Sequence, residues 1–273
     1  MYAGVDIGGT KTLVAVLDDD GVIQESRKFP TPHNYQHFIL ELQHAVAFLA
    51  TKDFKAAGVA IPGRLDRKHG RALKLGNLPW SNVPVQADCE KIFHCPVVIE
   101  NDANLAALSE AMVHKKYHNV LYVTISTGIG TGFISDKTIV PSLVDGEGGH
   151  MILPHNGKLE EWESFASGRA IFEHYGKKAA NITDQGDWKT IARNLALGLF
   201  EHIALLQPDV IIIGGSVGTY FEKYGKYLKD ELDKYAVPVV PIPPVVAAKR
   251  PEVAVIYGCY DLARQKFNHG QAA

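Results

Sequence analysis

The chain has 273 residues, enough for two hydrophobic cores, because single cores stop growing beyond ~250–300 residues. Its formal net charge of −2 excludes a strongly basic surface for nucleic acid or acidic lipid. Cys89, Cys95 and Cys259 lack disulfide or metal spacing, no basic leader opens the chain, and no apolar run approaches the ~20 residues of a membrane span. We therefore expect a cytoplasmic protein without nucleic-acid or membrane partners.

The first part of the chain predicts a sheet that opens as a β-meander. Residues 2–16 read as strand, glycine turn and strand, and residues 18–21 form the next turn. Apolar residues at helical spacing predict a helix at 35–50, followed by a short buried strand at 56–61. A further helix is expected at about 103–112.

The second part repeats this pattern. Residues 119–140 again read as strand, glycine-rich turn and strand, which indicates a duplicated lobe. A helix at 188–206, a strand at 209–213 and a polar helix near 220–235 follow, and the Pro-rich residues 237–246 are expected to form a surface loop. Alternating strands and helices predict an α/β fold.

The opening glycine turn is the first candidate ligand site. Gly8 and Gly9 let backbone N–H groups approach an anion without an intervening Cβ. The spacing is not that of a P-loop, because Thr10 separates the glycines from Lys11 and a strand follows. A tight hairpin is the alternative. Asp6, however, is a charge in an apolar strand and needs a partner such as a water-bound Mg²⁺.

Two later glycine turns are suited to the same ligand. Thr127 and Gly128 lie in a segment of three glycines and several hydroxyls beyond a buried strand. Gly214 and Gly215 follow a strand at the end where α/β sheets hold ligands. A purely structural turn explains each segment equally well alone. Together, the repeated turns indicate one nucleotide held between two lobes.

Asp102 directly follows the segment Ile99-Glu100-Asn101, with Asn104 two residues later. A carboxylate in that position can accept the proton of a bound hydroxyl group. The alternative is that Asp102 is the N-cap of the helix that follows, a position that favours Asp and Asn. Both roles are compatible with the same residue.

A second polar set lies further along the chain. Glu147 and His150 occupy a Gly-rich stretch that is expected to be a loop. With Asn101, Asp102 and Glu163 they supply carboxylates, a carboxamide and an imidazole, the groups that hydrogen-bond the vicinal hydroxyls of a sugar. A merely exposed histidine is the alternative for His150.

Together these segments resemble the ROK family of sugar kinases and sugar-responsive repressors. The matching motifs lie, in order, at residues 6–11, 61–63, 77–79, 100–104, 126–130, 149–151, 163–168 and 213–215. The resemblance implies an α/β fold of two duplicated actin-like (ribonuclease H-like) lobes around a central cleft. We expect an N-terminal lobe at 1–115, with the C-terminal helix 259–273 packing back on it, and a C-terminal lobe at 116–258.

The resemblance also implies a role for each matching residue. Asp102 matches the catalytic base. The expected sugar ligands are Asn101, Glu147, His150 and Glu163, with Gly63 and Asn77 in segments that line the same pocket. The implied cofactors are ATP and Mg²⁺, the latter held by Asp6 through water. The expected ATP-binding residues are Asp6, Gly8, Gly9, Thr10 and Lys11 in the first phosphate motif, Thr127 and Gly128 in the second, and Gly214 and Gly215 in the adenosine segment.

One segment departs from the family pattern. Most members carry Cys-x-Cys-Gly-x-x-Gly-Cys before the sugar-binding Glu and bind a structural zinc there, together with the His of the Gly-His pair. Residues 151–162 are shorter and contain no cysteine, and His150 with His155 supplies two of about four required ligands. We therefore predict no zinc site, and we expect apolar packing of Ile152, Leu159 and Trp162 to replace the metal.

The implied function is that of an ATP-dependent hexose kinase acting on a sugar hydroxyl, O6 of glucose or a related hexose, with Asp102 as general base. Kinases for fructose, mannose or an N-acetylated hexosamine are alternatives that the shared ligands do not separate. A non-catalytic sugar-sensing regulator is less favoured, because it needs a helix-turn-helix module and the first strand starts at Tyr2. A homodimer is the family expectation.

Overall fold

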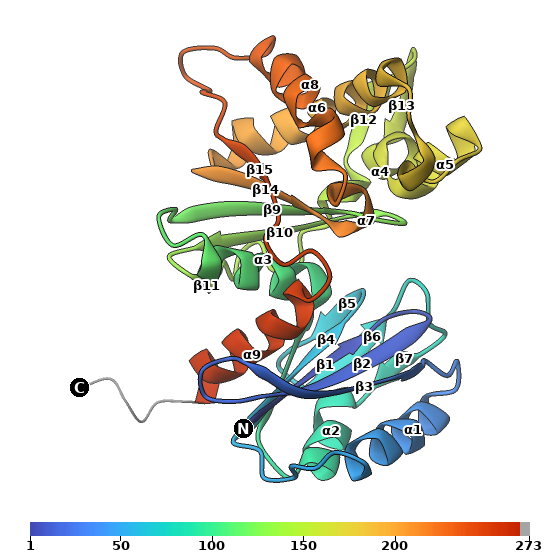
Figure 1. The fold of residues 1–273 in the computed structure, drawn as a ribbon, viewed down its shortest axis with the longest axis vertical. Helices are drawn as coiled ribbons and strands as arrows, with labels where there is room; N and C mark the ends of the chain where they lie inside the picture. The colour runs from blue at the N-terminus through green and yellow to red at the C-terminus, as the bar shows by residue number, and fades with distance from the viewer. Residues whose placement is uncertain (268–273) are drawn as a thin grey trace. The chain divides into compact units, whose positions relative to one another are not determined.

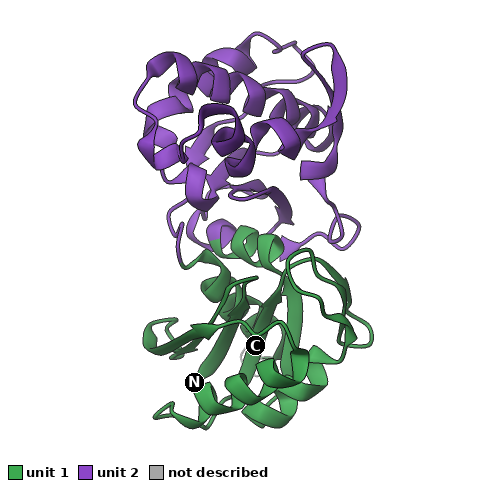
Figure 2. Cartoon of the chain, turned by 90° about the vertical axis from the view of Figure 1, so that its right-hand side faces the viewer, with its two compact units in different colours: residues 1–109, 253–273 green, residues 110–252 purple. Residues whose placement is uncertain are grey.

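The computed structural model describes residues 1–267, which form two compact units (Figure 2). Unit 1 comprises residues 1–109 and the segment from Val253 onward, and unit 2 comprises Glu110–Glu252. The chain therefore passes between the units twice, after residues 109 and 252. The boundaries expected from the sequence were 115/116 and 258/259. Residues 268–273 of the expected C-terminal helix lie outside the described residues.

Unit 1 is built on a five-stranded sheet of order β3-β2-β1-β4-β8 (Figure 1). The strands β1 (Tyr2–Ile7), β2 (Lys11–Leu17) and β3 (Ile23–Pro30) form the predicted antiparallel meander. The strands β4 (Ala56–Ile61) and β8 (Val97–Asn101) run parallel to β1. Asp6 is level with Ala60, and Ala60 with Glu100, so the three carboxyl ends share one edge.

Helices cover both faces of this sheet (Figure 1). The helices α1 (Tyr35–Ala47) and α2 (Val85–Phe93) share a core with Ala3, Val5 and Ile7 of β1. The helices α3 (Asp102–Val113) and α9 (Ala254–Phe267) cover the opposite face, where Tyr2 packs on Tyr260. Because side chains alternate along a strand, Asp6 points to the same face as Tyr2.

A small antiparallel sheet that the sequence did not predict follows β4. Its strands are β5 (Arg64–Asp66), β6 (Arg71–Lys74) and β7 (Ser81–Val83). Gly63 introduces it with φ of +92°, a conformation that favours glycine. A Cβ there would also lie 2.4 Å from the carbonyl oxygen of Lys74.

Unit 2 repeats the sheet of unit 1, with the order β11-β10-β9-β14-β15. The strand β9 (Asn119–Ile125) is antiparallel to β10 (Ile129–Ser135), which pairs with β11 (Thr138–Ile139), and is parallel to β14 (Val210–Gly214). The predicted duplicated α/β lobe is therefore confirmed. The Pro-rich loop prediction was too long, because β15 (Val245–Ala247) joins the sheet edge beside β14.

The helices of unit 2 pack over one face of β9 and β14, where their apolar side chains form one core. The main helices are α6 (Gln185–Leu206) and α8 (Phe221–Asp233). The helix α6 starts three residues before its predicted position, because Asp184 caps it by accepting the N–H of Asp187 at 3.0 Å. The remaining elements are η1 (Gly148–His150), β12 (Ile152–His155), β13 (Lys158–Glu161), α4 (Trp162–Ala166), α5 (Gly168–Tyr175), η2 (Ala179–Asn181) and α7 (Gly215–Gly218).

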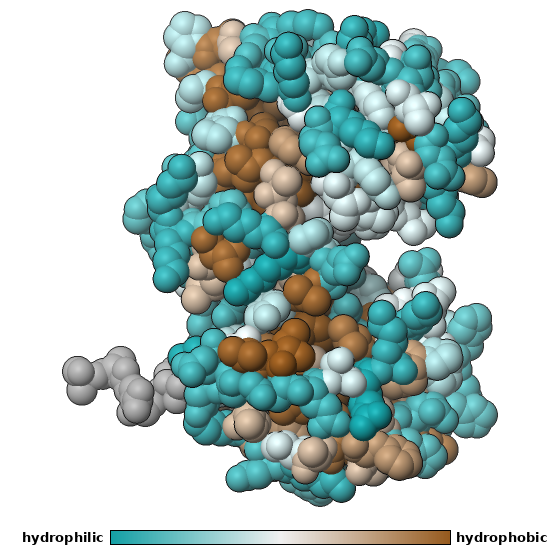
Figure 3. Space-filling view, in the orientation of Figure 1, coloured by the Kyte–Doolittle hydropathy of each residue, from teal (hydrophilic) through white to brown (hydrophobic). Residues whose placement is uncertain are grey.

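The surface carries separate apolar patches among hydrophilic residues on the face seen in Figure 3. Within residues 1–267, no helix combines the length and the apolar composition needed to cross a lipid bilayer.

The contact of α9 with α3 requires glycine. A Cβ on Gly258 would lie 2.0 Å from the carbonyl oxygen of Leu105. Because the atoms nearest to this Cβ belong to the Leu105 backbone, a change of side-chain rotamer cannot relieve the overlap. We predict that Gly258→Ala lowers the free energy of unfolding by ~1–3 kcal/mol through overpacking. Gly76→Ala is the matched control, because nothing lies within 4 Å of a Cβ there. Chemical denaturation measures both variants, and equal stability of the two would contradict the packing of α9.

Candidate active site

Asp6 and Asp102 are two partly buried acids in unit 1, and the charge of Asp102 acts on Asp6. Asp6 lies one residue before the end of β1, and Asp102 is the first residue of α3, directly after β8. Burial, together with the negative charge of Asp102, raises the pKa of Asp6 to about 7. Burial also raises the pKa of Asp102, against the opposing effect of the hydrogen bond from the N–H of Ala103. Such a pair has affinity for protons and for divalent cations.

Asn101, and not Asp102, caps α3. Its Oδ1 accepts the N–H of Ala103 at 2.9 Å and that of Asn104 at 3.4 Å, the pattern of an N-cap residue. Asp102 Oδ1 also accepts the N–H of Ala103, at 2.8 Å. The structure thus makes Asn101 the N-cap residue, while Asp102 is an acid in the first turn of α3.

The first glycine turn brings two further predicted residues together. Gly8 closes the turn by donating its N–H to the carbonyl of Lys11 at 3.0 Å. A Cβ on Gly9 would lie 2.7 Å from the Cβ of Asn77, so this predicted pocket residue packs directly on the turn. Thr31, which the sequence did not single out, holds the turn from behind through a 2.8 Å hydrogen bond to the carbonyl of Gly8.

Gly63 lies beside the Asn101 side chain. Asn101 Nδ2 donates to the carbonyl oxygen of Gly63 at 3.5 Å. Unit 1 therefore assembles seven of the predicted residues around the carboxyl ends of its parallel strands, namely Asp6, Gly8, Gly9, Gly63, Asn77, Asn101 and Asp102. Thr10 and Lys11 follow in the same hairpin, where both are exposed.

In unit 2, the second glycine turn meets Glu163. Glu163 lies in the first turn of α4 and accepts the N–H of Ile129 at 3.1 Å. A Cβ on Gly128 would lie 2.4 Å from Glu163 Oε2, so glycine there allows the carboxylate to approach the turn. Arg169 contacts the other carboxylate oxygen at 3.3 Å. The turn of Thr127 and Gly128 therefore lies against a predicted sugar ligand.

The Gly214–Gly215 segment joins the same region. Gly215 has φ of +78°, and a Cβ there would lie 2.5 Å from the carbonyl oxygen of Ile125, just before the second glycine turn. Ser216 donates its N–H to Ser126 Oγ at 3.3 Å. A cavity of about 260 Å³ adjoins the ends of β14 and β15, lined in part by Ile213, Gly218, Thr219, Phe221, Ala247 and Ala248.

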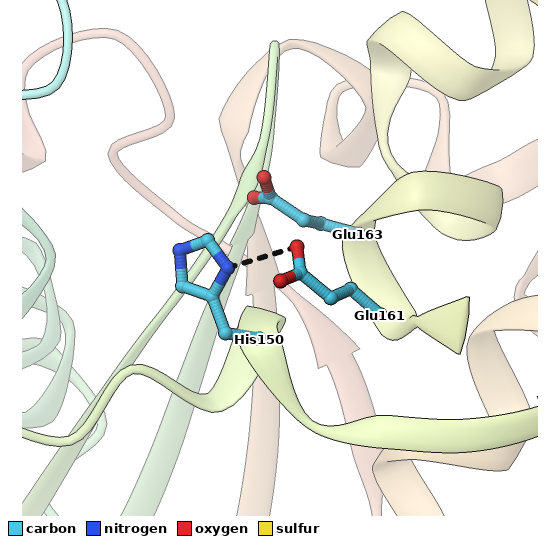
Figure 4. Close-up of side chains that lie close together, drawn as sticks. All are labelled: His150, Glu161 and Glu163. Atoms are coloured by element: carbon cyan, nitrogen blue, oxygen red, sulfur yellow. Dashed lines mark hydrogen bonds and ion pairs between the residues drawn. The ribbon is translucent and has the colours of Figure 1, made fainter. Parts of the chain in front are cut away.

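His150 points toward two glutamates (Figure 4). Its Nδ1 lies 3.1 Å from Glu161 Oε2, and ligand atoms of His150, Glu161 and Glu163 all lie within 4.8 Å of one another. The hydrogen bond to Glu161, together with the nearby charges of Glu163 and Glu147, raises the pKa of His150. His150 ends the single helical turn η1 instead of lying in a loop. The predicted site omitted Glu161, although it stands two residues before Glu163.

The cysteine-free segment before Glu163 forms the hairpin β12–β13. Its turn is Asn156-Gly157, both with positive φ, which is a recognisable hairpin signal. The predicted apolar packing is wrong for Ile152 and Leu159, because the strand register leaves them 57% and 73% exposed.

Aromatic packing orders the base of this hairpin. Trp162 is fully buried as predicted, with its indole N–H donated to the carbonyl of Asn194 at 3.1 Å. His155 stacks on Phe165 with ring centroids 4.1 Å apart and pairs with Glu160 at 2.9 Å. A cavity of about 710 Å³ adjoins this stack, and none of the predicted site residues lines it.

The donor set at His150 does not fit a structural zinc site. Zinc in such sites takes four ligands, mainly thiolate and imidazole. The imidazole of His150 is paired with Glu161, and His155 is directed to Glu160. The three cysteines are buried in unit 1, whereas His150 lies in unit 2. The residues in place favour an ion pair at this position.

Comparison with known proteins gives a consistent result. A model of the ROK family matches residues 2–266. Glucokinase from Streptomyces coelicolor is 28% identical over 308 aligned residues, covering 96% of this chain and 97% of that protein. N-acetyl-D-glucosamine kinase from Citrobacter koseri is 29% identical, covering 94% of this chain and 97% of that protein.

Among solved structures, the ROK family glucokinase from Streptomyces griseus in complex with glucose and AMPPNP gives a TM-score of 0.81 at 28% identity. The match covers 97% of this chain and 99% of that chain. The predicted family and the predicted actin-like fold are thereby confirmed.

We predict that the protein contains no stoichiometric zinc, because the His150 region lacks the required donors. Dialysis against a chelator should leave the thermal unfolding midpoint unchanged, and elemental analysis should find far less than one zinc per chain. One zinc per chain that resists buffer exchange, or a fall in the midpoint after chelation, would contradict the ion-pair interpretation.

Proposed function

The chain belongs to the ROK family, and from that premise we propose that this sugar kinase transfers the γ-phosphoryl group of ATP to a hexose hydroxyl, O6 of glucose or a related hexose. The observation that carries the proposal is Asp102, a partly buried carboxylate with a raised pKa at the start of α3, where Asn101 is the N-cap residue. The acid is thus available for a proton.

Asp102 is proposed as the general base. Burial raises its pKa, which makes its carboxylate a better proton acceptor than an exposed aspartate. Phosphoryl transfer has a loose transition state, so alignment of the hydroxyl and neutralisation of charge supply most of the acceleration. Asp102 aligns the hydroxyl oxygen and accepts its proton as the new bond forms.

The residues around Asp6 fit a magnesium ion. Desolvation and, second, the negative charge of Asp102 raise the pKa of Asp6 to about 7, and a divalent cation would favour the ionised form of both acids. Asp6 would hold the ion through water. When bound, Mg²⁺ neutralises charge on the transferring phosphoryl group.

The glycine turns are proposed to bind the nucleotide. The backbone N–H of Gly9, with Thr10 and Lys11, would provide donors for phosphate oxygens, while Gly8, whose N–H closes the turn, leaves the approach free of a side chain. Thr127 and Gly128 provide a second set in unit 2. The cavity beside β14 and β15 is of a size to accept a base next to Gly214 and Gly215. The bound AMPPNP of the Streptomyces griseus relative supports ATP as the donor.

The sugar is proposed to bind through Asn101, Glu147, His150 and Glu163, whose amide, carboxylate and imidazole groups suit vicinal hydroxyls. Glucose is the first candidate. Mannose, fructose and N-acetylated hexosamines remain alternatives, and the relatives include both glucokinases and N-acetyl-D-glucosamine kinases. We further propose a cytoplasmic location, in keeping with ATP as donor and with the three free cysteines, and a homodimer, which rests on the family expectation alone.

A sugar panel with ATP and Mg²⁺ tests the proposal. We expect phosphorylation of at least one hexose, with glucose first, measured as sugar phosphate formed per ATP consumed. Asp102→Asn should bind the sugar while turnover falls by ~10²–10⁴-fold, since the amide cannot accept the proton. Near-wild-type turnover of this variant would exclude Asp102 as base. Sugar binding by the wild type without ATP consumption would instead identify a sugar-sensing regulator.

The pH dependence of sugar binding should report on His150. Its raised pKa widens the pH range over which the imidazole is protonated, and a protonated ring donates hydrogen bonds from both nitrogens. As pH rises through this pKa the proton is lost, so KM for the sugar should increase on the alkaline side. Glu161→Gln should move this increase to lower pH. Glu160→Gln is the matched control, because Glu160 pairs with His155. Superimposable profiles for the two variants would exclude the role of Glu161.

A further inference from the structure

A partly buried ion pair involves Glu100, which lies two residues before the proposed base. Glu100 is the penultimate residue of β8 and is only 4% exposed. Arg67, in the turn between β5 and β6, donates Nε to Glu100 Oε2 at 2.7 Å and Nη2 to Glu100 Oε1 at 2.5 Å. The guanidinium therefore engages both carboxylate oxygens, a bidentate geometry that fixes direction as well as distance.

The same carboxylate also holds the segment that carries Asp102. Glu100 Oε1 accepts the N–H of Asn101 at 2.7 Å and the side-chain amide of Asn104 at 3.1 Å. These two contacts lie on either side of Asp102 in the sequence. The orientation of residues 101–104 thus depends on where the Glu100 carboxylate is held.

Arg67 belongs to a braced turn. Asp66 accepts the N–H of His69 at 3.1 Å, and its other carboxylate oxygen lies 2.7 Å from the His69 ring. The strand β5 that precedes Arg67 begins directly after Gly63, whose carbonyl accepts from Asn101. Two contacts therefore connect the small sheet to residues 100–104.

The net stability of such a pair does not explain its presence. Removing two charges from water offsets most of their attraction, so an apolar pair of similar volume would be about as stable. A bidentate pair differs from an apolar contact because it requires one relative orientation of the guanidinium and carboxylate groups. The pair therefore fixes the position of the Glu100 carboxylate more than it stabilises the fold.

We propose that Arg67 and Glu100 are positioning residues for phosphoryl transfer, which hold Asp102 and Asn101 in register with the substrate-lining segments at Gly63 and Asn77. This inference rests on the proposed function. Neither residue contacts the reacting groups. Their contribution to turnover comes through the first turn of α3.

We call the Arg67–Glu100 ion pair, with its contacts to residues 101–104, the clamp. The test compares variants that break the clamp with one that loosens only the small sheet. Arg67→Met/Glu100→Gln removes both charges together, so no buried charge is left alone, and Gln retains an oxygen for the Asn101 N–H. Arg71→Met is the matched control, because Arg71 donates to Asn82 within the small sheet, at 2.6 Å to Oδ1. Arg67→Lys retains charge without the bidentate geometry.

We expect kcat of the double variant to fall by ~10–100-fold, as for a misplaced catalytic group, with its thermal midpoint close to that of Arg71→Met. Arg67→Lys should be intermediate, and Arg71→Met should keep near-wild-type kcat. A double variant with the kcat of Arg71→Met would overturn the proposal.

Hydrogen exchange provides a readout that is independent of activity. The amides of residues 101–104 should exchange faster in the double variant than in Arg71→Met. Equal protection of these amides in the two variants would also contradict the proposal that Arg67 and Glu100 order this segment. If the wild type phosphorylates no sugar of the panel, the proposed function fails. The exchange comparison then still decides whether Arg67 and Glu100 order the first turn of α3.

Discussion

The placement of two partly buried like charges, Asp6 and Asp102, at one sheet edge is the constraint on which unit 1 depends. Parallel pairing of β1, β4 and β8 brings their carboxyl ends level, and this places Asp6 beside the start of α3. Neither acid is stable there as an isolated ion, so the surrounding groups are arranged to compensate. Asn101 provides the cap that α3 needs, and Glu100 has its own arginine. Neither the N-cap position nor the ion pair with the arginine therefore involves the Asp102 carboxylate.

The two halves of the predicted site are stabilised in different ways. In unit 1 the ligands are attached to strand ends and a helix terminus, so the sheet itself sets their positions. In unit 2 Glu163 and His150 flank a short hairpin, and local contacts hold their side chains in place. Glu163 accepts the Ile129 N–H, and His150 pairs with Glu161. The stack of His155 on Phe165 and the buried Trp162 anchor that hairpin. Charge pairing and aromatic packing thus order this hairpin and the residues beside it.

Local sequence signals predicted most of the fold. The two strand–turn–strand repeats, the apolar strands and the helix at 35–50 depend on neighbouring residues, and the structure reproduces them. The Asn156-Gly157 hairpin and the Asp184 cap were also readable locally but were overlooked. By contrast, Arg67 pairs with Glu100 across 33 positions, and Thr31 reaches Gly8 across 23. Nothing in either local segment specifies such a partner. The exposure of Ile152 and Leu159 likewise follows from a strand register that composition does not determine.

The discontinuity of unit 1 has a consequence for biosynthesis. Unit 2 is one continuous stretch, whereas the sheet of unit 1 receives α9 only after residue 252 has been made. While the chain emerges from the ribosome, unit 2 can therefore complete its core first. Until α9 arrives, Tyr2 and Ala60 lack the apolar cover that Tyr260 and Cys259 later give them. The nascent enzyme therefore passes through a stage in which one face of its first-made sheet is open to chaperones, and that face is covered only when α9 docks.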